Sequence, residues 1–79
     1  MNIERWVHPA DRVIIGPVKS AVFDRGDLGI IGTNLRVGDI VARFIDGEGI
    51  GLIAAEMDLT TAQVEAAVRT ALRARKHWP

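Results

Sequence analysis

Polar and basic side chains near the C-terminus have the types and spacing that fit a chemical task. Residues 61–76 carry threonine, glutamine and arginine between the apolar residues of a predicted helix. Glutamine matches the hydrogen-bonding edge of adenine, and arginine matches guanine or a phosphate. The candidate DNA-binding residues on an outward-facing side are Thr61, Gln63, Arg69, Thr70 and Arg73, with Glu65 beside them.

The charge distribution fits DNA binding in part. Residues 61–79 hold four Lys/Arg and one acid, a net +3, whereas residues 41–60 hold one arginine and four acids, a net −3. The whole chain of 79 residues has a formal net charge of +0. Two interpretations of the basic helix end stay open. It either contacts DNA or complements the negative pole of its own helix dipole.

Catalysis has little support in the sequence. With no cysteine, disulfides and thiolate metal sites are excluded. His8 and His77 lie 69 positions apart, and neither has an acid nearby at metal-ligand spacing. Ser20 is the only serine, and no G-x-S-x-G sequence surrounds it. We therefore expect no catalytic residue, no metal ion, no cofactor and no enzyme activity.

Three amphipathic helices are expected to position the candidate residues. Apolar residues recur at i, i+3, i+4 and i+7, which places each set on one helix face. The breaks between the helices are Asp46-Gly47-Glu48-Gly49 and Met57-Asp58-Leu59. The three apolar sets are Val37, Ile40, Val41, Phe44 and Ile45; Ile50, Ile53, Ala54 and Met57; and Val64, Ala67, Val68, Ala71 and Leu72.

The third helix has a clear predicted start. Thr60 and Gln63 have the spacing of a capping box, in which each side chain satisfies a free backbone N–H. Leu59 and Val64 can form the hydrophobic staple around the same boundary. A short helix, a tight turn and a longer capped helix form the outline of a helix-turn-helix, whose second helix reads DNA from its N-terminal end.

Short strands are predicted before the helices. Residues 13–15, 18–23 and 28–33 are β-rich runs separated by glycine, proline and aspartate. Gly16-Pro17 predicts a hairpin turn between the first two runs. The predicted fold is mainly α with short N-terminal β-strands: one domain over residues 1–79, with strands and turns in 1–36 and a three-helix unit in 37–76.

One sequence pattern resembles a known family. Residues 31–37 read IGTNLRV, followed by DIV at 39–41, GE at 47–48, IA at 53–54, LT at 59–60, and then Val64 and Ala67. This resembles the bacterial domain of unknown function 433 family over about residues 22–75. The resemblance implies a homeodomain-like helix-turn-helix unit preceded by a β-hairpin. It also implies an antitoxin-like role beside a PIN-like ribonuclease toxin, so the implied partners are a toxin protein and duplex DNA.

The family-motif positions are Gly32, Thr33, Asn34 and Val37; three of them match the family, whereas Asn34 stands where the family has arginine. Glycine permits a tight or left-handed turn, and threonine can hydrogen-bond to nearby backbone. We interpret this pair as a corner that forms the fold, because no phosphate-binding glycine pattern surrounds it. The glycines at 47, 49 and 51 do not complete a G-x-G-x-x-G loop.

Small size favours self-association. A domain this short, with no disulfide or metal, is marginal alone, so we expect a homo-oligomer, a dimer above all, joined through the N-terminal strands. Trp6 and Trp78 fit packing inside the domain or between copies; the alternative is a hot spot for another protein.

No apolar run approaches a membrane span and no signal peptide is evident, which predicts a cytoplasmic protein. The alternative function is an assembly module that does not bind DNA.

Overall fold

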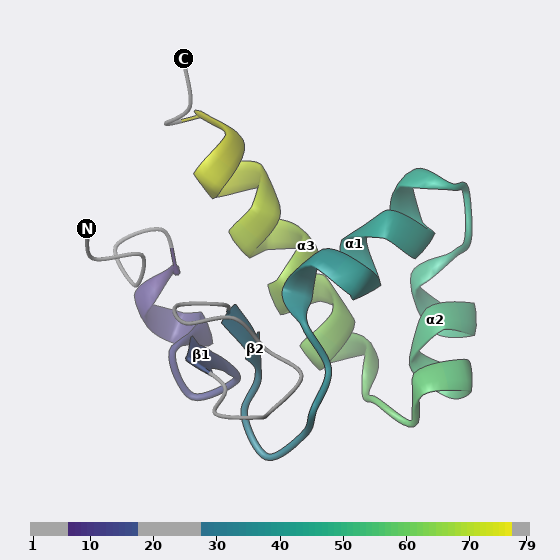
Figure 1. The fold of residues 1–79 in the computed structure, drawn as a ribbon, viewed down its shortest axis with the longest axis horizontal. Coiled ribbons are helices and arrows are strands. Elements are labelled where there is room, and N and C mark those ends of the chain that lie inside the picture. Colours follow the sequence, from purple (N-terminus) through teal and green to yellow (C-terminus); the bar gives the residue numbers. More distant parts are fainter. Residues whose placement is uncertain (1–6, 18–27, 77–79) are drawn as a thin grey trace.

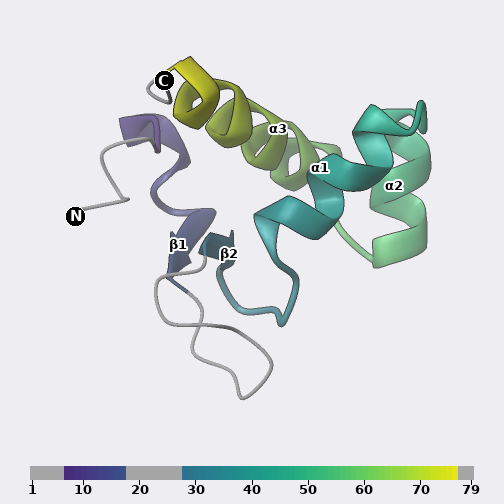
Figure 2. The same ribbon diagram turned by 45° about the horizontal axis from the view of Figure 1, so that its top comes forward.

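A two-stranded antiparallel hairpin followed by three helices makes up the computed structural model, which describes residues 7–17 and 28–76 (Figure 1). Views from two directions place the hairpin and α2 on opposite sides of the crossed pair α1 and α3 (Figure 2). In chain order the elements are a 3₁₀ turn η2 (Pro9–Asp11), β1 (Ile15–Pro17), β2 (Leu28–Ile30), α1 (Val37–Ile45), α2 (Ile50–Met57) and α3 (Thr61–Lys76).

The three predicted helices are confirmed. Their apolar faces meet in one core that also includes residues of the hairpin and of the N-terminal segment. The capping box at the start of α3 is present: Thr60 Oγ1 accepts from the Gln63 N–H at 3.1 Å, and Gln63 Oε1 accepts from the Thr60 N–H at 2.8 Å. The buried apolar residues are Val7, Ile15, Ile30, Val37, Ile40, Ile53, Ala54, Val64, Ala66 and Ala67.

The predicted turn at Gly16-Pro17 is wrong. Both residues belong to β1, where Gly16 pairs with Gly29 and Pro17 pairs with Leu28. Proline is tolerated there because it ends a three-residue strand and is exposed. The predicted strand at 18–23 lies outside the described residues. The predicted strand at 28–33 is confirmed only over 28–30, because the chain turns at Ile31-Gly32, where Gly32 has φ +85°.

Two tight turns set the helix arrangement. Between α1 and α2, Gly47 takes φ +101°, and Arg43 of α1 forms ion pairs with both Glu48 and Glu56. Between α2 and α3, Asp58 adopts the left-handed conformation at φ 57°, ψ 45°. The Leu59 N–H then donates to the Ala54 carbonyl at 2.8 Å, which ends α2 in the manner of a Schellman motif. None of the helices in the described ranges has the length and apolar character needed to cross a membrane.

Candidate functional site

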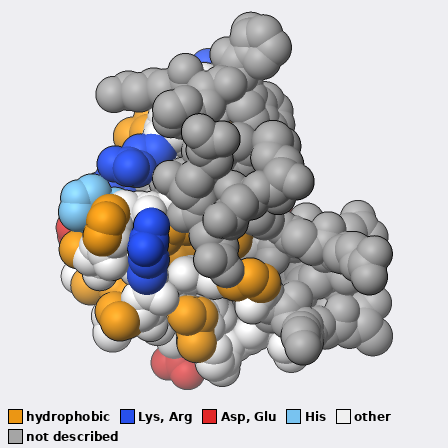
Figure 3. Space-filling model, turned by 90° about the vertical axis from the view of Figure 1, so that its left-hand side faces the viewer, with side chains coloured by type: hydrophobic (Ala, Val, Ile, Leu, Met, Phe, Trp, Pro, Cys, Tyr) orange, Lys and Arg blue, Asp and Glu red, His pale blue; other side chains and the backbone are white. Residues whose placement is uncertain are grey.

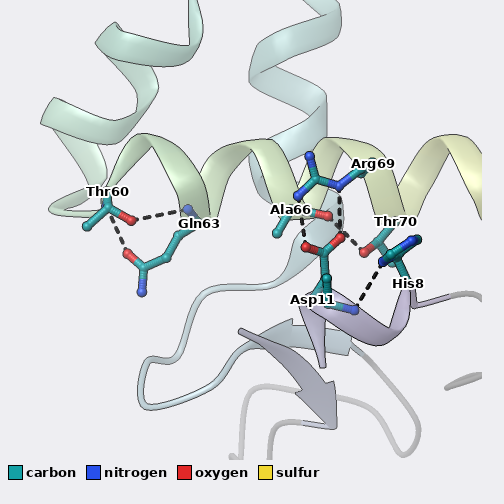
Figure 4. Close-up of polar contacts among 8 residues, drawn as sticks. His8, Asp11, Thr60, Gln63, Ala66, Arg69 and Thr70 are labelled. Carbon is teal, nitrogen blue, oxygen red and sulfur yellow. Dashed lines mark hydrogen bonds and ion pairs between the residues drawn. The ribbon is translucent and has the colours of Figure 1, made fainter. Parts of the chain in front are cut away.

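The N-terminal half of α3 was the predicted DNA-reading surface, and the structure exposes part of it. Thr61 and Glu65 are exposed, as is the intervening Ala62. Gln63 is only half exposed, and its amide oxygen is held by the backbone of Thr60 in the capping box (Figure 4). A side chain that caps its own helix has less freedom to reach a base edge, so Thr61 and Glu65 remain the most accessible of these positions.

Thr70 does not lie on the outward-facing side. Thr70 is 2% exposed, and its hydroxyl donates to the Ala66 carbonyl one turn earlier at 2.8 Å (Figure 4). The prediction that Thr70 faces outward is therefore wrong. The predicted exposed face included too many positions, because packing in the folded chain buries both Ala66 and Thr70.

Arg69 is exposed, but it is engaged in an ion pair. Its Nε and Nη2 donate to the two carboxylate oxygens of Asp11 at 2.9 Å and 2.8 Å (Figure 4). The Asp11 side chain is 5% exposed and the Arg69 side chain 50% exposed. Hydrogen bonds from Arg69 lower the pKa of Asp11 and outweigh the opposing effect of burial. A guanidinium has five N–H donors, so Arg69 keeps others for a second contact, although Asp11 neutralises its charge.

Asp11 is held in place by the turn that contains it. His8 precedes η2, and its Nδ1 accepts from the Ala10 N–H at 3.0 Å, as an N-cap does (Figure 4). Val7, just before the cap, is 1% exposed in the core. The N-terminal segment is thus fixed to α3 both by an apolar anchor and by the Asp11–Arg69 pair.

Arg73 is half-buried, and its charge acts on Asp11. Arg75, two positions beyond the predicted set, is exposed. Basic charge therefore gathers toward the C-terminal end of α3, away from the end that would enter a groove. Around the α2–α3 turn the exposed charged residues Glu56, Asp58 and Glu65 are acidic.

A second surface is a groove between α1 and α3, which we call the α1–α3 groove. It has a volume of about 190 Å³. Ile45 is 72% exposed, Leu72 54% and Phe44 39%, although the sequence pattern predicted all three on buried helix faces. The core of the chain therefore leaves the last turns of the apolar faces of α1 and α3 uncovered. The groove is lined by Val41, Phe44, Ile45, Val68, Ala71, Leu72 and Arg75.

The family motif forms the corner that leads into α1. Thr33 Oγ1 donates to the Ile30 carbonyl at 2.8 Å and accepts from the Leu35 N–H at 3.1 Å. Gly32 supplies the left-handed backbone, and Val37 is the first residue of α1 and part of the core. Asn34 is exposed. The structural interpretation of the Gly32-Thr33 pair is confirmed.

Exposed apolar residues also surround β1, where Val13 is 81% and Ile31 49% exposed. Figure 3 views the molecule from this side and shows hydrophobic side chains beside basic ones, next to atoms drawn in grey. The predicted dimer through the N-terminal strands would use this region.

Trp6, Ser20, His77 and Trp78 lie outside the described residues. Within the ranges 7–17 and 28–76, no three His, Asp or Glu side chains gather in a way that could hold a metal ion.

Sequence reasoning missed Asp11 as the partner of Arg69 and missed the α1–α3 groove. No local pattern links two residues 58 positions apart. The groove had a visible pattern, because its residues complete the apolar stripes, but the stripes do not say where the core ends.

A scan of protein-family models found no match to this chain, and comparisons with curated proteins and with solved structures found none either.

Proposed function

We propose that this chain is a small antitoxin-like regulator that binds duplex DNA through α2 and α3. The observation that carries the proposal is the arrangement of these two helices. An eight-residue helix, the turn Asp58–Leu59–Thr60 and a capped 16-residue helix reproduce the helix-turn-helix outline. The turn of that motif often contains glycine, and here Asp58 takes the left-handed conformation that glycine favours.

In this proposal the first two turns of α3 enter the major groove and read bases. Thr61 can contact a base or a phosphate, and Glu65 can accept from the amino group of cytosine. Arg69, oriented by Asp11, stands one turn further along the helix. The toxin partner enters the proposal from the sequence resemblance of residues 22–75.

The acidic side chains around this surface shape the kind of binding that we propose. Asp58 and Glu65 repel phosphates, whereas Glu56 is paired with Arg43, so non-specific attraction to DNA is weak. Binding then depends on base contacts in a particular sequence. The same acidic side chains favour the second candidate function, an assembly module without DNA binding.

The test is a selection from a random duplex library at about 50 mM salt, followed by fluorescence anisotropy on the enriched sequence up to about 200 mM. Glutamate at Thr61, the first residue of α3, suits the helix dipole but repels DNA. We expect Thr61→Glu to lower DNA affinity about tenfold. Ala42→Glu adds the same charge to an exposed position of α1 and is the matched control, with less than about a twofold effect.

Enrichment of one sequence, with Thr61→Glu weaker than Ala42→Glu, supports the proposal. Failure to enrich any duplex at low salt overturns it and leaves the assembly module. Equal losses in the two variants would also contradict it, because net charge rather than the position on α3 would then govern binding.

A further inference from the structure

The α1–α3 groove combines a hollow and a projection in one patch. Val68, Ala71 and Leu72 of α3 follow the i, i+3, i+4 spacing of a helix that packs against another helix. Ala71 is small, which allows a second helix to approach closely. Leu72 is 54% exposed at the edge of the groove, so its side chain is available to fill a similar hollow.

Two charged side chains border the same patch. Arg75 lines the groove from α3, and Asp46 follows Ile45 at the end of α1. Both are exposed, and neither side chain has a hydrogen bond or ion pair among the described residues. One positive group therefore lies in the groove, and one negative group directly follows a groove residue in the chain. In a two-fold contact, a residue pair that forms between the two copies forms twice, once in each direction. Asp46 of each copy can therefore face Arg75 of the other.

We propose that the α1–α3 groove is the contact surface of a homodimer, occupied by α3 and the end of α1 of a second copy. Leu72 of each copy fills the groove of the other, and two Asp46–Arg75 ion pairs close the ends of the interface. A patch with its own hollow, projection and opposite charges fits a second copy better than a partner of one charge sign. The location differs from the N-terminal strands that the sequence predicted.

This dimer leaves the N-terminal end of α3 free. Thr61 and Leu72 are separated by eleven residues of helix, or roughly 16 Å at the usual rise per residue. Dimerisation can therefore be tested independently of DNA binding. Its apolar centre is small compared with the roughly 800 Å² per partner of a standard interface, so we expect a dissociation constant of roughly 10–100 μM.

The first experiment measures the association of the full chain by sedimentation equilibrium without DNA. Leu72→Glu places a charge in the proposed interface, and we expect the dissociation constant to rise at least about tenfold. Leu52→Glu is the matched control, since Leu52 is 53% exposed on α2 and does not line the groove. Circular dichroism checks that both variants remain helical.

The second experiment reverses the bordering charges. Asp46→Arg and Arg75→Glu each create two like-charge contacts in a homodimer, and we expect each to raise the dissociation constant about tenfold. An equal mixture of the two variants restores opposite charges at both contacts, so the mixed dimer should form in preference to either homodimer. A hetero-partner surface would not show this rescue.

The proposal is overturned if the wild-type chain is monomeric up to about 1 mM. It is also overturned if Leu72→Glu dimerises as well as Leu52→Glu, because the dimer then uses another surface. Absence of rescue in the mixture refutes the two-fold pairing of Asp46 with Arg75.

Discussion

Replacing Arg69 with methionine removes the guanidinium that neutralises the carboxylate of Asp11. Methionine keeps the aliphatic length of the side chain and the helix propensity, so the main loss is the ion pair. Asp11 is 5% exposed and receives both hydrogen bonds from Arg69, and the variant leaves this carboxylate buried without them. Breaking a fully buried pair costs about 3–5 kcal/mol.

The half-exposed guanidinium lowers that figure. Since the Arg69 side chain is 50% exposed, water already screens part of the interaction, and we expect a loss of about 2 kcal/mol in the free energy of unfolding at neutral pH. For a chain of this size that corresponds to a drop in Tm of roughly 8–16 °C. Asp11→Asn should cost less, because it leaves a half-exposed arginine and no buried charge.

The pH dependence supplies an independent check. Arg69 holds the pKa of Asp11 below its ordinary value of 3.8, so the unfolded chain takes up the proton first as the pH falls. The stability that the pair contributes is present in full well above pH 3.8 and is lost as the pH falls through the lowered pKa. The difference between wild type and Arg69→Met should therefore be largest near neutral pH and narrow in acid.

The assay is urea unfolding followed by circular dichroism at about 1 μM protein, where the proposed dimer is dissociated. Arg75→Met is the control because Arg75 is exposed on the same helix. Equal stability of the two methionine variants would refute the reasoning, as would a larger loss in Asp11→Asn than in Arg69→Met. The result also governs DNA experiments. A loss of DNA binding in an Arg69 variant has to be separated from a loss of folded protein.

Two further predictions concern the turns. Asp58→Val should lower the free energy of unfolding by about 1–2 kcal/mol, because a β-branched residue fits the left-handed conformation poorly, whereas Asp58→Gly should be neutral or slightly stabilising; equal stability in urea would contradict this. Thr33→Val should lose about 1–2 kcal/mol with its two hydrogen bonds, and Thr33→Ser should retain most of the stability in the same assay.

Local patterns in the sequence were sufficient for the helices and their boundaries. Apolar periodicity placed α1, α2 and α3, and the Thr60–Gln63 pair located the start of α3 because a capping box involves residues three positions apart. The Gly32-Thr33 corner was equally local. Strand pairing was harder to predict, since β1 pairs with residues 28–30, which do not follow it directly in the sequence.

The exposure of the candidate residues depended on contacts between distant parts of the chain. The sequence pattern placed Thr70 on the outward-facing side of α3, but packing in the folded chain buries it. The partner of Arg69 comes from 58 residues earlier. A helical stripe indicates which residues share a face, but only the packed neighbours decide how much of that face is covered.

The sequence by itself determined a small protein with an antiparallel strand region and three amphipathic helices, because hydrophobic spacing, glycines and caps act over a few residues. The tertiary structure decided which of those faces remain open: it engaged Arg69 with Asp11, and it left Phe44, Ile45 and Leu72 exposed along the α1–α3 groove. The physical reason is that burial is a property of neighbours in space, and this short chain has too few elements to cover every apolar face.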